Sequence, residues 1–550
     1  MIPAPELTQT PAVTQHWTVG ELLRAQVRKD PERPFIETIA GECRSYAEVL
    51  CEAERAACAL QALGVQRGET VAIMLRNGLD AVNAWLGANL LGAADVTLNT
   101  AYRGTLLEHA LNQAQSKILV IGAEFVEVLR ASETELRYLE RVLVVGRSAL
   151  EWRPACLNLL DYADTMQSAG PVSAWPPVHP SDIASVIYTS GTTGPGKGVL
   201  MPHAQVILLA QRTAAKLRMR TEDIYYSFHP LYHMAGKFMQ VLACAAAGAK
   251  LVLDESFAPD RWLQRVRDSG ATVSGAHGPM LEMIHAQPAS GADREHRLRV
   301  ICSAPFPSHI ASSFEQRFGV RGVEVWGMTE VGIPLWSSLD EPLREGSCGR
   351  VDAEWFEFQI VNPDTDEPVP VGQPGEFVVR PRHPWTLMQG YMGMPGKTVE
   401  AWRNLWFHSG DTGYADETGN VYFLDRTSDR IRRRAENISA HDIEVAALRH
   451  SAVAEAVAIG IPSEFAGDDD VKLCIVCPPG APFDPKDLLR HLAGLLPHFM
   501  VPRYIEQFTE LPRSATHKVQ RALLRAMPAT ANAWDRKAHG VALRELVEKS

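Results

Sequence analysis

The segment Tyr188 to His203 combines residue types that hold phosphate groups. It follows an apolar run and packs glycines, hydroxyl side chains and a lysine into ten positions: Thr189, Ser190, Gly191, Thr192, Thr193, Gly194, Gly196, Lys197 and Gly198. Glycines let backbone N–H groups close on phosphate oxygens, hydroxyls add further donors, and the lysine supplies positive charge. The sequence therefore predicts a phosphate-binding loop here.

Two other interpretations of this segment are weaker. Gly191, Gly196 and Lys197 match the GxxxxGK pattern of P-loop NTPases, but Gly198 stands where that motif needs Ser or Thr to hold magnesium. A glycine-rich linker would not need so many hydroxyl groups directly after an apolar strand.

The segment resembles the signature loop of the adenylate-forming superfamily, which contains acyl-CoA synthetases, peptide-synthetase adenylation domains and luciferases. Four further segments follow in the family's order, and the resemblance runs from about Gly20 to Lys518: they are 325–330, 406–413, 425–444 and 511–519. It implies a carboxylate that attacks the α-phosphate of MgATP, releasing pyrophosphate into the loop of residues 188–198. The acyl group then passes from the adenylate to coenzyme A.

The segment Val325 to Glu330 has the chemistry of a nucleotide site. An aromatic ring can stack on adenine, and a hydroxyl beside a carboxylate can hold magnesium on phosphate oxygens. The resemblance places Trp326 on the adenine, Thr329 at the α-phosphate and Glu330 on the metal as a catalytic residue. The remaining nucleotide-binding positions that it implies here are Gly327, Met328, Ser303, Ala304 and Pro305. Taken alone, Trp326 would more often be a core residue.

The third segment, Trp406 to Gly413, carries a carboxylate suited to a ribose. Asp411 can accept hydrogen bonds from both ribose hydroxyls, although an Asp that caps its own turn is the plain alternative. The resemblance adds Arg426 to the ribose site. Asp425 to Asp429 is the expected linker between domains, with Ser428 at the pivot.

The sequence departs from the family pattern at this linker. Ser428 replaces the commoner Asp or Lys, and Ala435 stands where the family has glycine beside the pantetheine tunnel. The basic run 430–434 could meet the phosphates of coenzyme A, and a solvated basic face fits it equally well.

Lys518 lies in the last of the similar segments. The resemblance implies that it stabilises the charge that develops on the α-phosphate, although His517 replaces the usual preceding glycine. Considered alone, it would be a surface lysine. The small domain would carry Lys518 away before the thiol attacks, by a rotation about Ser428.

The acyl pocket is expected from Tyr232 to Lys237, from His277 to Pro279 and from the residues after Glu330. The resemblance places His233 beside the substrate carboxylate as a catalytic residue, with packing as the alternative. Lys237 and His277 in this pocket would favour an acid with a second polar group over a long alkyl chain.

The acceptor of the acyl group separates the subclasses. Few residues follow Lys518, which favours free coenzyme A over an attached carrier domain, and nothing specifies a luciferase pocket. The style of Leu98 to Tyr102 and of Ala435 to Ser439 is most similar to the crotonobetaine/carnitine-CoA ligase branch. Two alternatives remain: an adenylate-forming enzyme with another acceptor, and a non-catalytic nucleotide sensor.

Strand and helix patterns alternate along the first part of the chain. Short apolar runs such as Thr70 to Leu75 indicate buried parallel strands, and Ser45 with Glu48 indicates a capping box at a helix start. From 350 to 425 short alternating runs indicate antiparallel strands. We expect an α/β fold: a large AMP-binding domain (1–425) of doubly wound subdomains with a β-barrel-like part, and a small mobile α+β domain (426–550). From Trp534 the chain looks like an amphipathic helix or a mobile tail.

Composition agrees with a soluble enzyme. The 550 residues carry 54 basic and 65 acidic side chains, a net charge of −11, which argues against a nucleic-acid binder. The nine cysteines are scattered, as in a reduced protein, and no signal peptide or membrane-spanning run is evident. We expect a cytoplasmic enzyme that uses ATP, Mg²⁺ and coenzyme A on a small carboxylic acid, with a homodimer left open.

Overall fold

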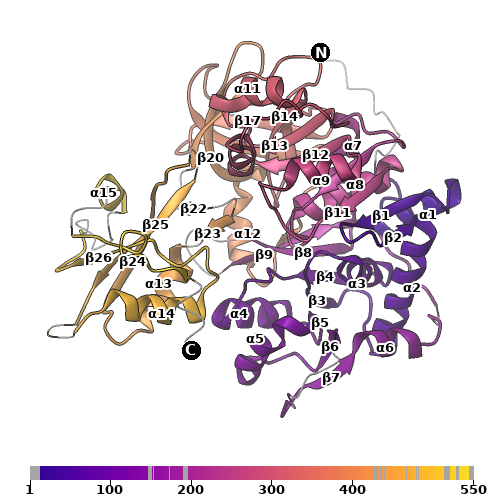
Figure 1. Ribbon diagram of the computed structural model, residues 1–550, viewed down its shortest axis with the longest axis horizontal. Coiled ribbons are helices and arrows are strands. Elements are labelled where there is room, and N and C mark those ends of the chain that lie inside the picture. Colours follow the sequence, from indigo (N-terminus) through magenta and orange to yellow (C-terminus); the bar gives the residue numbers. More distant parts are fainter. Residues whose placement is uncertain are drawn as a thin grey trace.

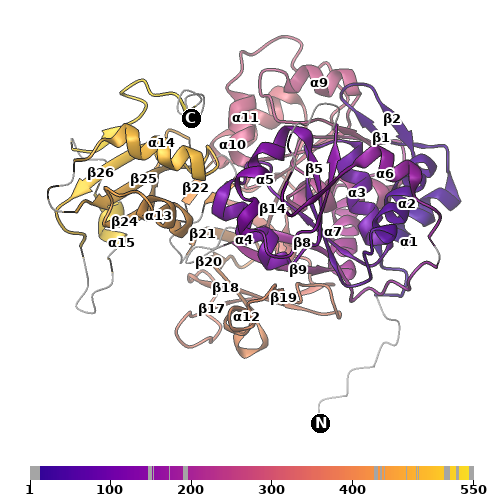
Figure 2. The ribbon, with the colours of Figure 1, turned by 90° about the horizontal axis from the view of Figure 1, so that it is seen from below.

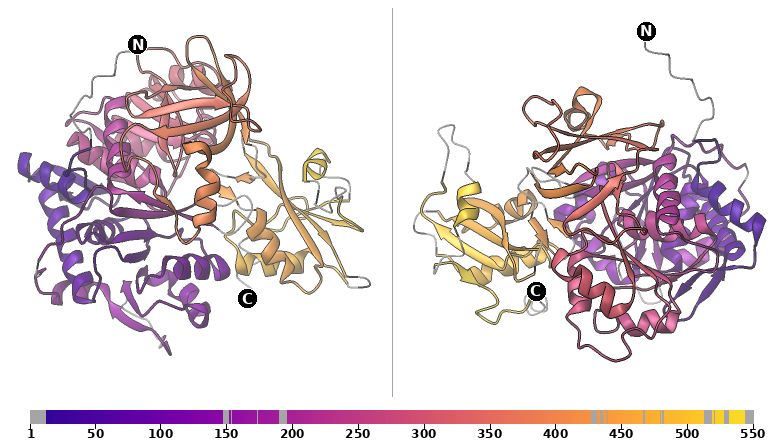
Figure 3. Two further views of the ribbon diagram at one scale, coloured as in Figure 1. Left: turned by 180° about the vertical axis from the view of Figure 1, so that it is seen from behind. Right: turned by 90° about the horizontal axis from the view of Figure 1, so that it is seen from above.

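The chain forms a large N-terminal unit and a smaller C-terminal unit in the computed structural model (Figure 1). Figures 2 and 3 show from other sides that the yellow C-terminal unit stands beside the rest of the chain. The structure describes residues 13–146, 152, 154–172, 174–189, 196–426, 431–433, 436–438, 440–465, 468–478, 480, 482–512, 519, 521–527 and 532–543.

The first sheet of the large unit is mostly parallel, as the alternating strand and helix pattern predicts. The described strands run in the order β19 (Gly390–Tyr391), β9 (Lys197–Pro202), β8 (Ile183–Thr189), β4 (Ala94–Thr97), β3 (Thr70–Met74), β5 (Ile118–Gly122), β6 (Arg141–Val145) and β7 (Asn158–Asp161). Only β9 and β19 among them run antiparallel to their neighbours. The predicted phosphate loop connects β8 to β9.

The second sheet joins a parallel half to an antiparallel half. Its described strands follow the order β17 (Phe356–Val361), β18 (Gly375–Pro381), β20 (Phe407–Ala415), β21 (Val421–Arg426), β16 (Ser347–Val351), β15 (Gly332–Trp336), β14 (Arg321–Met328), β13 (Val300–Ala304), β12 (Val273–His277), β10 (Ile224–Ser227), β11 (Lys250–Leu253), β1 (Pro34–Thr38) and β2 (Cys43–Ser45). From β14 to β17 the pairing is antiparallel, and this part includes the antiparallel strands predicted for 350–425. Strand β16 also contacts β17, so these strands curve back toward each other.

Helices cover both sheets of the large unit. They are α1 (Val19–Lys29), α2 (Tyr46–Ala62), α3 (Leu79–Leu90), α4 (Gly104–Ala114), α5 (Val126–Ala131), α6 (Tyr162–Ser168), α7 (His203–Lys216), α8 (Leu242–Ala247), α9 (Trp262–Ser269), α10 (Gly278–His285), α11 (Ser308–Phe318) and α12 (Pro395–Ala401), with short 3₁₀ turns Ala123–Phe125, Glu133–Glu135 and Arg403–Leu405 and a π-helix Ala235–Val241.

Two helices show how the sequence sets this packing. The predicted capping box of α2 is present, with Ser45 and Glu48 each bonding the other's backbone N–H. Helix α3 is apolar on nearly all sides and is buried except at Asp80, because it packs between neighbouring elements. At Gly87 a Cβ would lie 2.6 Å from that of Ala56, so glycine allows α3 to pack closely on α2.

The C-terminal unit has its own sheet and core. It contains a hairpin of β22 (Ile431–Arg433) and β23 (Glu436–Ile438), a sheet of β24 (Glu455–Pro462), β25 (Asp469–Val476), β26 (Tyr504–Phe508) and β27 (Trp534–Asp535), and helices α13 (Ala440–Leu448), α14 (Pro485–Leu495) and α15 (Arg521–Ala526).

The expectation of a helix or mobile tail from Trp534 is wrong for the described residues. Trp534 and Asp535 form β27, which pairs with β26, and Asp535 makes an ion pair with Arg503 at 3.2 Å. A two-residue strand has too few positions to show an alternation, so its partner rather than its own pattern decides its structure. Within the described chain, we find no helix long and apolar enough to cross a membrane.

Candidate active site

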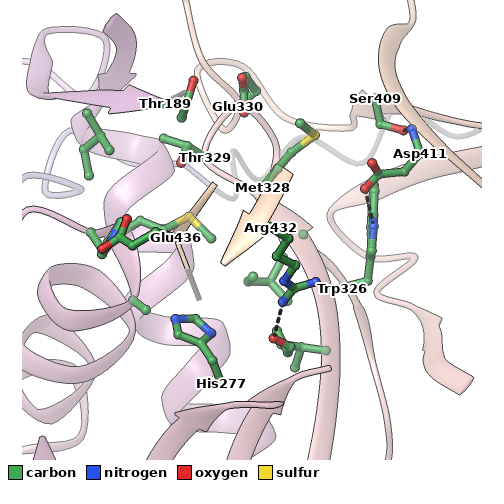
Figure 4. Close-up of a pocket in the computed structure, with 18 of the residues that line it drawn as sticks. Thr189, His277, Trp326, Met328, Thr329, Glu330, Ser409, Asp411, Arg432 and Glu436 are labelled. Carbon is green, nitrogen blue, oxygen red and sulfur yellow. Dashed lines mark hydrogen bonds and ion pairs between the residues drawn. The ribbon is translucent and has the colours of Figure 1, made fainter. Parts of the chain in front are cut away.

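A cavity of about 1030 Å³ lies where the large unit meets the β22–β23 hairpin (Figure 4). Its wall includes described residues from every predicted motif segment of the large unit and from the hairpin: Thr189, Gly196, Lys197, His233, Ser303, Ala304, Pro305, Trp326, Gly327, Met328, Thr329, Glu330, Asp411, Arg432 and Glu436. Segments more than two hundred residues apart thus line one space.

The two ends of the phosphate loop open into this cavity. Thr189 ends β8 and Lys197 begins β9, where Lys197 Nζ lies 4.8 Å from the ring centre of Tyr391. His109 on α4 holds the carbonyl of Gly196 through Nε2 at 2.9 Å. The other predicted loop residues, Ser190, Gly191, Thr192, Thr193 and Gly194, lie outside the described residues.

Trp326 and Asp411 contact each other. The indole Nε1 donates to Asp411 Oδ2 at 2.9 Å, and the ring packs edge-on against Phe358 and Phe377. Trp326 is only 7% exposed, so it is a core residue that also lines the cavity. Asp411 lies inside strand β20 opposite Arg426 of β21, not in a turn that it caps. The structure describes the backbone of Arg426 but not its side chain.

Glu330 is held at the cavity wall by fixed donors. It is 5% exposed, and its Oε1 accepts from Tyr391 Oη at 3.0 Å. Gln205 Nε2 donates to the carbonyls of Thr329 and Glu330, at 2.9 and 3.2 Å. A Cβ on Gly327 would lie 2.0 Å from the carbonyl oxygen of Gly332, so glycine is required for this hairpin to close.

Tyr391 connects this carboxylate with the phosphate loop. Its hydroxyl bonds Glu330 while its ring faces Lys197, and both contacts lie on the cavity wall. Tyr391 could not be selected from the sequence, because a lone tyrosine between turns carries no motif.

Comparison of the sequence with known protein families shows which family has this arrangement of domains. An AMP-binding enzyme model matches residues 23–392, and a model of the AMP-binding enzyme C-terminal domain matches 442–518. The chain belongs to the AMP-binding enzyme family. A crotonobetaine/carnitine-CoA ligase of Salmonella paratyphi A is 29% identical over 508 residues, which cover 90% of this AMP-binding enzyme and 96% of the relative.

Solved structures share the fold of this AMP-binding enzyme. ATP-bound MatB from Rhodopseudomonas palustris is 27% identical, with a TM-score of 0.66 over 92% of this chain and 98% of that one. The amide bond synthetase McbA from Marinactinospora thermotolerans is 23% identical, with a TM-score of 0.78 over 92% and 99%. The second likeness concerns the fold alone.

The C-terminal hairpin of this AMP-binding enzyme reaches the cavity with Arg432 and Glu436. Arg432 Nη2 donates to the carbonyl of Ala304 at 3.3 Å, and Glu436 Oε1 lies 3.3 Å from His233 Nε2. Figure 4 shows Arg432 near Trp326 and Glu436 on the other side of the cavity. Sequence analysis gave Glu436 no role, although it lies in the segment that matches the family linker.

The His233 and Glu436 pair changes the pKa of both groups. Burial lowers the pKa of His233, but the charge and hydrogen bond of Glu436 together outweigh burial, so the pKa is raised. Burial raises the pKa of Glu436, yet His233 brings it below its usual value overall. Both shifts favour the charged forms and thus a salt bridge between the two units.

The expectation that Lys237 belongs to the acyl pocket is wrong. Lys237 is fully buried, forms an ion pair with Asp95, and donates to Ser185 Oγ at 3.1 Å and to Thr97 Oγ1 at 3.3 Å. It lies on the π-helix and points away from the cavity, toward strand β4. The sequence could not reveal this, because Asp95 is 142 residues away. His277 does line the cavity, as predicted.

Beyond the phosphate loop, further predicted positions of this AMP-binding enzyme lie outside the described residues. They are the pivot Ser428, the substituted Ala435 and the lysine Lys518. Ser303 and Pro305 are described, and Ser303 Oγ donates to the carbonyl of Pro305 at 2.6 Å, which fixes this turn at the cavity wall.

Proposed function

We propose that this enzyme is an ATP-dependent acyl-CoA synthetase, an AMP-forming carboxylate-CoA ligase. One observation carries the proposal: a single cavity collects the ends of the phosphate loop, the segment Trp326 to Glu330, Asp411 and the C-terminal hairpin. A nucleotide, a carboxylate and a thiol must meet in one place for this reaction. The name of the Salmonella relative agrees with it.

In the first step the cavity wall would hold ATP. Thr189, Lys197 and the intervening loop would bind the β- and γ-phosphates, Thr329 the α-phosphate, Trp326 with Ser303 to Pro305 the adenine, and Asp411 with Arg426 the ribose. The contact between Trp326 Nε1 and Asp411 holds the aromatic ring and the ribose acceptor in a fixed relation. Substrate attack would then release pyrophosphate toward Lys197.

The carboxylate of Glu330 is suited to bind Mg²⁺. Among the described residues no cluster of three or more His, Cys, Asp or Glu side chains forms a metal cage. Mg²⁺ in nucleotide sites commonly binds through one or two carboxylates together with substrate phosphates and water, so one buried carboxylate such as Glu330, next to Thr329 on the cavity wall, suits it. Bound there, the ion would neutralise phosphate charge, while Tyr391 keeps the Glu330 carboxylate oriented.

In the second step the C-terminal unit would serve the thiol. We propose a division into 1–425 and 426–550 with the pivot at Ser428. The placement of Arg432 and Glu436 at the cavity supports an arrangement in which the hairpin serves the reacting carbonyl. His233 would border the substrate carboxylate from the other side.

The reaction is tested by supplying ATP, Mg²⁺ and a panel of carboxylic acids, with and without coenzyme A. Without coenzyme A we expect pyrophosphate and acyl-adenylate that depend on the acid, and with coenzyme A we expect AMP together with a thioester. AMP without thioester would point to another acceptor, such as an amine. AMP from no acid would favour a nucleotide sensor and overturn the proposal.

Replacing Glu436 with glutamine is expected to slow thioester formation about tenfold and to spare adenylate formation. The substitution keeps a hydrogen bond to His233 but removes the charge, and hydrogen bonds to charged groups are about twice as strong as neutral ones. Single-turnover measurement of AMP-linked and thioester products separates the two steps. Glu464→Gln, which alters a surface pair with Lys537, is the matched control.

The contact between His233 and Glu436 should also depend on pH. Because Glu436 raises the pKa of His233, the ion pair contributes fully below the ordinary histidine pKa and is lost as pH rises through the raised value. The thioester step of Glu436→Gln should therefore approach that of the wild type at high pH. An equal ratio at every pH would contradict a charged contact.

A further inference from the structure

The inner end of the cavity is formed by β10, β12, β13 and the π-helix 235–241. In the parallel pair β12 and β13, His277 lies beside Ala304 and Gly275 beside Cys302. Side chains alternate along a strand, so these four residues share one face, and the second pair lies about 7 Å deeper than the first. An acid whose carboxylate is bordered by His233, as proposed above, would extend its tail past His277 and over Gly275.

Gly275 lets two polar groups reach the cavity wall, because a side chain here would crowd them. A Cβ at this position would lie 2.7 Å from Tyr225 Oη and 3.2 Å from Gln240 Nε2, and both residues line the cavity. Helix α7 packs against the π-helix, and its residue Thr213 also lines the cavity. The buried Thr213 Oγ1 has no hydrogen-bond partner within the described part of the chain. The inner end thus presents polar atoms to whatever fills it.

The polar groups at this end are fixed in place by one another. Gln240 Oε1 accepts from Ser227 Oγ, and Gln240 Nε2 lies 2.9 Å from His229 Nδ1. Tyr225 is buried at 1% exposure, within the sheet itself. A preformed donor and acceptor set of this kind costs little reorganisation when a ligand binds.

The titratable side chains at the inner end of the cavity are shifted toward their uncharged forms near neutral pH. Burial lowers the pKa of His229 well below its usual value and that of His277 to about 4. Burial raises the pKa of Tyr225, and it raises that of Glu324 on β14 to about 8. The one lysine or arginine on these four fully described elements, Lys237, is already paired with Asp95. A charged tail would therefore lose its hydration without gaining an opposite charge.

We infer that the enzyme activates monocarboxylic acids whose far end carries an uncharged hydrogen-bonding group, such as a hydroxyl, received by the hydroxyl of Tyr225, which Gln240 orients through a hydrogen bond. This inference rests on the proposed function and narrows its substrate class. A buried site built to bond a hydroxyl rejects the analogue that lacks it, because its own polar atoms would be left unpaired. A long alkyl chain, a dicarboxylate and a quaternary ammonium acid fit this end less well.

The first experiment compares acids of matched size in the AMP release assay. The pairs are 4-hydroxybenzoate with 4-methylbenzoate, and 5-hydroxypentanoate with hexanoate; glutarate, decanoate and carnitine represent the other classes. In whichever pair serves as substrate, we expect kcat/KM to be at least about tenfold higher for the hydroxylated acid than for its methylated partner. Preference for the methylated member, or AMP only from glutarate, decanoate or carnitine, overturns the inference and leaves the proposed function standing.

The second experiment removes the hydroxyl that Tyr225 supplies. Tyr225→Phe is expected to reduce the preference for the hydroxylated acid about tenfold, while the methylated acid reacts within about threefold of its wild-type rate. Gln240→Met should act in the same direction. Tyr226→Phe is the matched control, because Tyr226 Oη bonds Asp254 at 2.8 Å and does not line the cavity.

The outcomes of the two experiments separate the two claims. An unchanged preference in both Tyr225→Phe and Gln240→Met overturns the assignment of these residues, even if AMP forms normally. AMP from no acid at all, in a wild-type protein that still shows its folded circular dichroism spectrum, overturns the proposed function and the inference together.

Discussion

Replacing Lys237 with methionine is expected to lower the free energy of unfolding by about 3–5 kcal/mol, the usual cost of breaking a buried ion pair. Lys237 and Asp95 are both 0% exposed. Removing the ammonium would leave the Asp95 carboxylate without its opposite charge, and Ser185 and Thr97 would lose a donor. The remaining charge, not the missing methylene contacts, accounts for most of this loss.

Urea unfolding followed by tryptophan fluorescence measures the effect, since Lys237 Nζ lies 4.7 Å from the ring centre of Trp85. Adding Asp95→Asn to Lys237→Met should recover part of the stability, because the double variant has no unpaired charge. Lys250→Met is the matched control: its partner Glu37 is about one third exposed, and surface pairs contribute up to about 1 kcal/mol. A Lys237→Met change as small as that of the control would contradict a buried charge pair.

Replacing Lys518 with alanine is expected to slow adenylate formation by about 10²–10³-fold. That is the usual effect of removing one group that stabilises charge in a transition state, and here the charge develops on the α-phosphate. The next residue, Val519, packs against a cluster of the C-terminal unit that includes Val457, Ile459 and Leu511. Lys518 is therefore attached to the unit that we propose to rotate.

The second half-reaction distinguishes this role from a general loss of folding. We expect Lys518→Ala to form thioester at nearly the wild-type rate when a synthetic acyl-adenylate and coenzyme A are supplied. Lys518→Arg should retain part of the adenylation rate because it keeps a positive charge. Lys537→Ala, which alters the exposed pair with Glu464, serves as control. A wild-type rate of adenylation in Lys518→Ala would overturn the catalytic assignment.

The predicted strands and helices largely agree with the structure, because local pattern determines them. The predicted strand at Thr70 to Leu75 forms β3 (Thr70–Met74), and the predicted capping box of Ser45 and Glu48 begins α2. A continuous apolar run suits only a strand covered on both faces, and a capping box suits only a helix start. The motif residues could likewise be selected from their types and order.

The sequence by itself thus determined the α/β class, the phosphate-binding segment and the family. Only the tertiary structure decided which residues meet: Trp326 with Asp411, His233 with Glu436, and Lys237 with Asp95. Periodicity records which face of an element is buried, but not which element covers it. Lys237 looked like a pocket residue for this reason, and a buried carboxylate on a strand 142 residues away assigned it to the core instead.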